Sequence, residues 1–174
     1  MLKNQIVYII GFMGCGKSTA GRKLASHLGW SFIDLDKKIE KYSGKTISEL
    51  FSEYGETYFR NIESEVLRSF KSLTNTVIST GGGTPCHDTN MDYMLESGLT
   101  IYLKLTANQL KNRLAESKGK RPLIKGLGSA ELLSFIEEKL AFREKWYNRA
   151  EIIIEAISLD ISILHNIVKS RLNA

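Results

Sequence analysis

Short apolar runs alternate with longer amphipathic segments along this chain of 174 residues. Five runs are almost continuously apolar, which predicts strands at 5–10, 31–33, 76–79, 99–103 and 152–154. Between them, helical patterning predicts helices at 17–28, 37–43, 46–54, 56–71, 88–96, 106–116, 129–147 and 159–172. Thr46 and Glu49 are spaced as in a capping box, which predicts the start of the helix at 46–54. Apolar strands separated by helices are typical of a parallel sheet with helices on both faces. We therefore expect an α/β protein, a three-layer α/β/α fold around a five-stranded parallel sheet.

The most informative motif lies directly after the first predicted strand. Residues 11–18 read Gly-Phe-Met-Gly-Cys-Gly-Lys-Ser, the complete pattern of a phosphate-binding P-loop. Its glycines allow successive backbone N–H groups to point at one anion, and the following helix adds its positive N-terminal dipole. Lys17 can reach the β- and γ-phosphates, and the Ser18 hydroxyl can bind Mg²⁺. The motif predicts a nucleoside triphosphate site.

Two further predicted strands end in residues of types that are common in binding and catalytic sites. Asp34 and Asp36 follow the second strand, and Gly81–Gly83 follow the third. Active sites of open parallel sheets lie beyond the carboxyl ends of the strands, so these residues are expected near the P-loop. The aspartates could meet Mg²⁺ or substrate hydroxyls, or could cap the next helix. The glycines could let backbone approach a ligand closely, or form a mobile turn. We favour the functional interpretation of both segments.

Three arginines are candidates for binding anions. Arg60 and Arg143 lie in predicted helices, where a lone arginine is usually solvated, but two guanidinium groups together could hold a carboxylate. Arg121 precedes a proline in residues 117–128, which break all periodicity and carry further lysines. This segment is either a solvated loop or a lid that closes over phosphates. In a lid, Arg121 would supply charge to the transferring phosphoryl group.

Composition narrows the classes of function. With 43% hydrophobic and 25% charged residues, the chain is typical of one globular domain, here 1–174. No apolar run approaches the length of a membrane span, and because the first predicted strand begins at residue 5 we expect no signal peptide. The net charge of +5 comes from basic residues interleaved with acidic ones, which disfavours nucleic-acid binding. Two cysteines, one of them inside the P-loop, fit a reducing, cytoplasmic setting.

The ordered set of motifs resembles the shikimate kinase family. The matching residues are Gly11–Thr19, Asp34 and Asp36, Gly55-Glu56 followed by Phe59-Arg60, Gly81–Gly83, Arg121-Pro122-Leu123, and Arg143 followed by Tyr147. The resemblance implies a P-loop fold of the nucleoside-monophosphate-kinase type, with a substrate-binding segment at about 35–63 and a lid at about 117–128. It also implies ATP-dependent phosphorylation of the shikimate 3-hydroxyl, in chorismate and aromatic amino-acid biosynthesis.

The resemblance implies a nucleotide side of the site. Lys17 and Arg121 would act on the phosphates, Ser18 would hold Mg²⁺, and Asp34 would lie near the metal, through water, and near the reacting centre. Arg113 resembles an arginine that stacks on adenine. The residues expected to bind ATP are Gly14, Cys15, Gly16, Lys17, Ser18, Thr19, Arg113 and Arg121.

On the acceptor side, the resemblance implies that Asp36 accepts hydrogen bonds from the shikimate hydroxyls and that Arg60 and Arg143 hold its carboxylate. Gly82 and Gly83 would contact shikimate through backbone. Phe51 and Phe59 match apolar positions beside the ring.

The sequence departs from the family pattern in one place and leaves some choices open. Family members often carry a proline in an adenine loop after the fifth strand, whereas residues 156–160 here read Ala-Ile-Ser-Leu-Asp. Asp34 is either a base or an organiser of the metal. A kinase acting on gluconate or a nucleotide, and a non-enzymatic nucleotide-binding protein, are the rival interpretations. We expect a monomer, because the chain is small and its site is self-contained.

Overall fold

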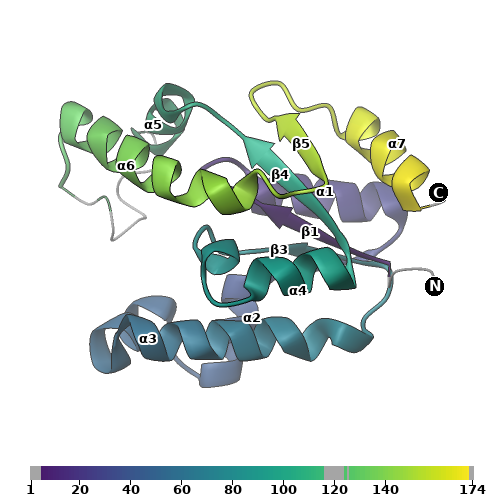
Figure 1. The fold of residues 1–174 in the computed structure, drawn as a ribbon, viewed down its shortest axis with the longest axis horizontal. Coiled ribbons are helices and arrows are strands. Elements are labelled where there is room, and N and C mark those ends of the chain that lie inside the picture. Colours follow the sequence, from purple (N-terminus) through teal and green to yellow (C-terminus); the bar gives the residue numbers. More distant parts are fainter. Residues whose placement is uncertain (1–4, 116–123, 125, 173–174) are drawn as a thin grey trace.

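A parallel five-stranded sheet forms the middle of the molecule (Figure 1). The computed structural model describes residues 5–115, 124 and 126–172. Its strands are β1 (Ile6–Ile10), β2 (Ser31–Asp34), β3 (Thr76–Ser79), β4 (Leu99–Lys104) and β5 (Ile152–Glu155). They run in the order β2-β3-β1-β4-β5, and every neighbouring pair is parallel. The predicted sheet is confirmed, and each strand lies within one or two residues of its expected position.

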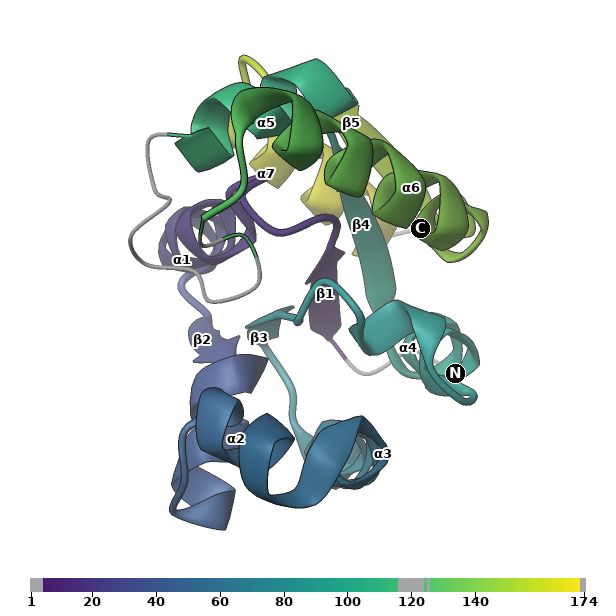
Figure 2. The ribbon, with the colours of Figure 1, turned by 90° about the vertical axis from the view of Figure 1, so that its left-hand side faces the viewer.

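Helices cover both faces of this sheet. They are α1 (Lys17–Leu28), α2 (Leu35–Ser43), α3 (Ile47–Arg68), α4 (Asn90–Ser97), α5 (Ala107–Ala115), α6 (Ser129–Tyr147) and α7 (Ile161–Leu172). Figure 2 shows α1 and α4 on opposite sides of the strands, while α2 and α3 pack together beyond the β2 edge. No helix in the described ranges is long and apolar enough to cross a membrane.

The start of α3 follows a predicted capping signal. Thr46 and Glu49 form the expected capping box at the start of α3. The helices expected at 46–54 and 56–71 are continuous except at Gly55, whose φ of 80° and ψ of 172° break the helical backbone. A positive φ costs glycine little, so this position allows the kink between the two halves. α2 begins earlier than expected because the Asp34 carboxylate caps it.

In the described ranges, the 3-10 segments η1 and η2 were not predicted. The segment η1 (Ser69–Ser72) replaces the last turn of the helix expected at 56–71. The segment η2 (Thr84–Cys86) has Pro85 in its first turn and precedes α4, which starts at Asn90 instead of the expected residue 88. These segments are too short to give a periodic pattern that sequence reasoning could detect.

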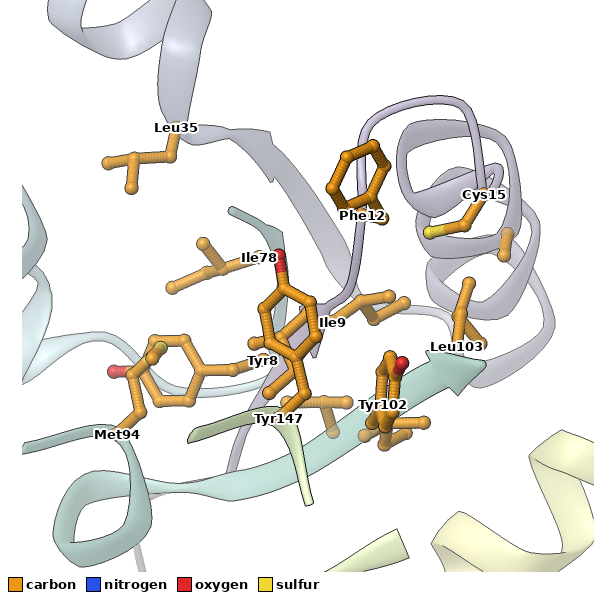
Figure 3. Packing of buried hydrophobic residues seen from close by; sticks show 14 of the residues in the cluster. Tyr8, Ile9, Phe12, Cys15, Leu35, Ile78, Met94, Tyr102, Leu103 and Tyr147 are labelled. Carbon is orange, nitrogen blue, oxygen red and sulfur yellow. The ribbon is translucent and has the colours of Figure 1, made fainter. Parts of the chain in front are cut away.

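The hydrophobic core surrounds the central strand. All five residues of β1 are fully buried, because helices cover the strand on both faces and β3 and β4 flank it. Figure 3 shows part of this core, in which Tyr8, Ile9 and Ile78 lie near Tyr102 and Tyr147. The register pairs Ile9 with Ser79 and Ser79 with Asp34. The carboxyl ends of β1, β2 and β3 therefore lie side by side at one edge of the sheet.

Candidate active site

A polar cavity of about 340 Å³ lies at this edge of the sheet. Its walls come from the P-loop, the end of β2 and the segment after β3, which are dispersed in sequence. The lining residues are Met13, Gly14, Gly16, Lys17, Ser18, Thr19, Asp34, Asp36, Ser79, Thr80, Gly81 and Gly82. The convergence expected from the parallel topology is therefore present.

The P-loop places a cation at the start of α1. Gly16 is the N-cap residue of this helix, and its φ of 97° is one that only glycine adopts without strain. Lys17 follows as the first helical residue and is 9% exposed. Its ammonium group donates a hydrogen bond to the Phe12 carbonyl at 2.9 Å. The helix N-terminus and this buried ammonium group make the cavity attractive to anions.

Ser18 and Asp34 bring two oxygen ligands together beside Lys17. The Ser18 hydroxyl donates to Asp34 Oδ2 at 2.8 Å, and it lies 3.3 Å from the hydroxyl of Ser79. The Asp34 carboxylate also accepts from the Lys37 backbone N–H, so it caps α2 while it faces the cavity. Helix capping and a position in the cavity are therefore compatible for Asp34. Hydroxyl and carboxylate oxygens are ligands of the kind that Mg²⁺ takes, so these residues fit that ion.

Asp36 lies in the same cavity, and its pKa is raised. Burial raises the pKa of Asp36 to about 6, and the charge of Asp34 adds to this rise while Lys17 opposes it. Glycine at position 81 allows the close approach, since a Cβ atom there would lie only 3.0 Å from Asp36 Oδ1. A buried carboxylate next to a second one is typical of a functional site.

Arg60 reaches the glycine segment from α3. A Cβ atom at position 83 would lie 2.6 Å from a nitrogen of the Arg60 guanidinium, so only glycine allows this approach. The guanidinium is held by Glu63 at 2.8 Å and by the more exposed Glu56 at 3.2 Å. It also lies over the ring of Phe59, 5.0 Å from its centroid. Arg60 is therefore a partly buried, oriented cation.

Arg143 reaches the same segment from α6. Its guanidinium lies 5.3 Å from the centroid of Phe12 and 3.2 Å from where a Cβ atom of Gly82 would be. Arg60 and Arg143, 83 residues apart in sequence, thus contact the adjacent positions Gly83 and Gly82. Two forked cations beside one backbone segment can hold a carboxylate between them.

Phe51 and Phe59 extend this side of the site. Their rings lie 4.6 Å apart, and Phe51 is one of the exposed large apolar residues of the molecule. The Arg60 guanidinium lies 6.0 Å from the Phe51 ring. An apolar surface therefore adjoins the arginine pair.

A second cavity, of about 370 Å³, lies on the other side of the P-loop. Arg113 spans it, because its guanidinium donates to the backbone carbonyl groups of Cys15 and Ala156 at 3.0 and 3.1 Å. The remaining walls come from the P-loop, from α1, which contributes Lys23, and from the segment after β5. This segment forms a wall of the cavity without a proline, through Ala156, Ile157, Ser158 and Leu159.

One predicted site residue falls outside the part of the chain that the structure describes. Arg121 and most of the expected lid at 117–128 lie between residues 115 and 126. The other candidates either line the two cavities or lie against the glycine segment.

Sequence reasoning missed a buried acid at this site. Glu63 is fully buried, accepts from Thr84 Oγ1 at 2.6 Å, and pairs with Arg60. One signal was available, because Glu63 falls between Ile62 and Val66 on the face of α3 that is buried. A carboxylate on an apolar helix face requires a partner.

Comparison with known proteins identifies the family. The family model described as Shikimate kinase matches residues 13–170 of this chain. The chain belongs to the shikimate kinase family. The shikimate kinase of Parabacteroides distasonis is 44% identical over 150 residues, which are 86% of this chain and 87% of that protein.

Solved structures of shikimate kinases have the same fold. The enzyme from Bacteroides thetaiotaomicron is 37% identical and superposes with a TM-score of 0.90, covering 98% of this chain and 99% of the other. The shikimate kinase from Acinetobacter baumannii, solved in complex with shikimate, is 30% identical with a TM-score of 0.80 and covers 99% and 93%. The predicted family and fold are confirmed.

Proposed function

We propose that this protein transfers the γ-phosphoryl group of ATP to the 3-hydroxyl of shikimate, giving shikimate 3-phosphate and ADP in the biosynthesis of chorismate and aromatic amino acids. One observation carries the choice of acceptor. Arg60 and Arg143 converge on Gly82 and Gly83, beside the Asp36 carboxylate and the P-loop cavity. Shikimate has one carboxylate and several hydroxyl groups, which match these cations and this acid in kind.

The P-loop side would bind ATP and its metal. Lys17 and the backbone N–H groups of Gly14–Thr19 would hold the phosphates. Ser18 would coordinate Mg²⁺, and Asp34 would act on the ion through water. When bound, Mg²⁺ neutralises phosphate charge in reactions of this kind. The adenine would occupy the second cavity against Arg113.

The acceptor side would orient the reacting hydroxyl. Arg60 and Arg143 would hold the carboxylate, and Gly82 and Gly83 would add backbone contacts. The Asp36 carboxylate would accept hydrogen bonds from the acceptor hydroxyls, which aims one of them at the γ-phosphate. Phosphoryl transfer depends on such positioning and on charge neutralisation rather than on covalent catalysis.

Further roles belong to the same proposal. Asp34, 2.8 Å from the Ser18 hydroxyl, would organise the metal and orient or deprotonate the acceptor. Arg121 would act on the transferred phosphoryl group from a lid at about 117–128, and residues 35–63 would form the substrate-binding segment of a single kinase domain, 1–174. We propose a monomeric, cytoplasmic enzyme, which gel filtration tests, because a concentration-independent dimer would contradict it.

A coupled ADP-release assay tests the reaction. The purified protein is mixed with ATP and Mg²⁺ and with shikimate, gluconate, a nucleoside monophosphate or no acceptor. We expect ADP release that depends on shikimate alone. Release with another acceptor would overturn the proposed acceptor site, and no release with any acceptor would favour a non-enzymatic protein.

A further inference from the structure

The last residue of α6 makes a hydrogen bond to the glycine segment. Tyr147 is fully buried, and its hydroxyl group donates to the backbone carbonyl oxygen of Gly82, 65 residues away in sequence. A carbonyl oxygen can only accept, so the direction of this bond is fixed. Burial raises the pKa of Tyr147 far above its ordinary value, and the hydroxyl therefore keeps its proton at any working pH.

A neighbouring tyrosine provides a natural comparison. Tyr102, in β4, is 1% exposed, and its ring centroid lies 5.0 Å from that of Tyr147 (Figure 3). Within the part of the chain that the structure describes, the hydroxyl of Tyr102 has no hydrogen-bond partner. Two tyrosines of equal burial thus share one region of the core, and only the hydroxyl of Tyr147 bonds to the glycine segment.

This bond adds a side-chain constraint to a glycine segment whose neighbouring carbonyl groups, those of Gly81 and Gly83, accept from the backbone N–H groups of Thr84 and Cys86. Gly82 has no side chain that packing could hold, and a glycine backbone is the most permissive of all. The peptide that joins Gly82 to Gly83 is planar, so fixing the carbonyl also fixes the direction of the Gly83 N–H. Arg143 lies one helical turn before Tyr147 on the same helix and approaches Gly82 as well.

We propose that Tyr147 is a positioning residue for the phosphoryl acceptor. Its hydroxyl group holds the Gly82–Gly83 peptide in a fixed position relative to Arg143. This inference rests on the proposed function, because it concerns the acceptor half of that site. Tyr147 itself does not reach the reacting atoms. It acts through the backbone and ties the glycine segment to the helix that carries Arg143. If Tyr147 served packing alone, its hydroxyl would be as dispensable as that of Tyr102.

The variants Tyr147→Phe and Tyr102→Phe test this idea as a matched pair. Each removes one oxygen from a buried ring, and the two rings touch. For Tyr147→Phe we expect kcat/KM for shikimate to fall about tenfold, which corresponds to roughly 1.4 kcal/mol, with the KM for ATP unchanged. For Tyr102→Phe we expect both constants to stay within about twofold, since no hydrogen bond is lost. Thermal unfolding and ADP binding report whether each variant is folded.

Each of the following outcomes would contradict a positioning role of Tyr147. Tyr147→Phe with wild-type kinetics would make the hydroxyl dispensable. An equal loss of shikimate and ATP affinity, or a loss of folded protein with unchanged KM values, would indicate packing alone. The proposed function fails separately: the wild-type protein would then show no shikimate-dependent ADP release. Should the panel reveal a different acceptor, the pair is compared with that acceptor.

Discussion

Asp36 is a buried acid whose ionisation opposes folding. Its carboxylate is buried beside Asp34, and these surroundings raise its pKa to about 6. The folded protein therefore binds a proton that the unfolded chain releases near pH 4. As the pH rises through this window, ionisation of Asp36 reduces the stability of the fold. This cost would follow from the proposed role of Asp36, which places an acceptor for substrate hydroxyls between Lys17 and the glycine segment.

The variant Asp36→Asn should accordingly be more stable than the wild-type protein at neutral pH. An amide does not ionise, so the variant avoids the loss of stability that the wild-type protein undergoes as the pH rises from about 4 to about 6. We expect its free energy of unfolding in urea at about pH 7.5 to be higher by about 1–3 kcal/mol. The difference should disappear near pH 3, which lies below the pKa of Asp36 in both states, and this comparison serves as the internal control. Equal stability at both pH values would contradict the assignment.

The same substitution should damage the acceptor site. Loss of a charged hydrogen bond of roughly 1.5–3 kcal/mol predicts a decrease of about 10–150-fold in kcat/KM for shikimate. In the wild-type protein without nucleotide, shikimate should bind more tightly as the pH rises through about 6, because the carboxylate is the better acceptor. Calorimetric titrations with shikimate measure this dependence, and in Asp36→Asn the step near pH 6 should be absent. Unchanged kinetics would remove Asp36 from the site.

At the scale of elements, a buried polar network fixes α3 against the segment after β3. Asn90, fully buried at the start of α4, donates to the Thr84 carbonyl at 3.0 Å. Its Oδ1 accepts from the Ser64 hydroxyl and from Arg68, both in α3, at 3.0 and 2.8 Å. The Thr84 hydroxyl continues the network to Glu63, the partner of Arg60. The helix that carries Arg60 is thus tied to the glycine segment that it contacts.

Replacing Asn90 with alanine tests the network. The change removes a fully buried amide and leaves the Thr84 carbonyl and the part-buried Ser64 hydroxyl without this partner, so we expect a loss of about 1–3 kcal/mol in unfolding free energy. The KM for shikimate should rise while that for ATP stays constant, because α3 loses its register against the glycine segment. The control is Asn61→Ala, at an exposed position of α3, which should be neutral or slightly stabilising. Similar KM values in Asn90→Ala and the wild type would limit Asn90 to a role in stability.

The limits of sequence reasoning are clearest for such networks. The capping box of Thr46 and Glu49 depends on residues three apart, so a local pattern was sufficient to predict it. The bonds of Asn90 join residues 6 to 26 positions apart and depend on how α3 and α4 pack. No local periodicity encodes that packing. Glu63 was detectable in principle, whereas the partner of the Tyr147 hydroxyl was not.

At the scale of the whole molecule, the sequence was sufficient to predict the architecture of the sheet, whereas it did not predict the polar network. The alternation of strands and helices specified a parallel sheet, and parallel connections bring the strand ends to one edge. The P-loop, Asp34, Asp36 and the glycine segment therefore had to converge, and they do. The strand order β2-β3-β1-β4-β5 was not predicted, since short apolar strands carry little information on which neighbours they pair with.

The proposal of one domain predicts a single cooperative unfolding transition. The only two tryptophans lie near opposite edges of the sheet, because Trp30 directly precedes β2 and Trp146 lies in α6, shortly before β5. Both are partly buried and pack against the same core. Trp30→Phe and Trp146→Phe each leave one fluorescent probe, and the unfolding curve of each variant should coincide with its own circular dichroism curve. ADP with Mg²⁺ at a hundred times its Kd should stabilise both variants by about 2.7 kcal/mol. If nucleotide shifted the unfolding curve of only one of the two variants, the two edges of the sheet would unfold as separate units.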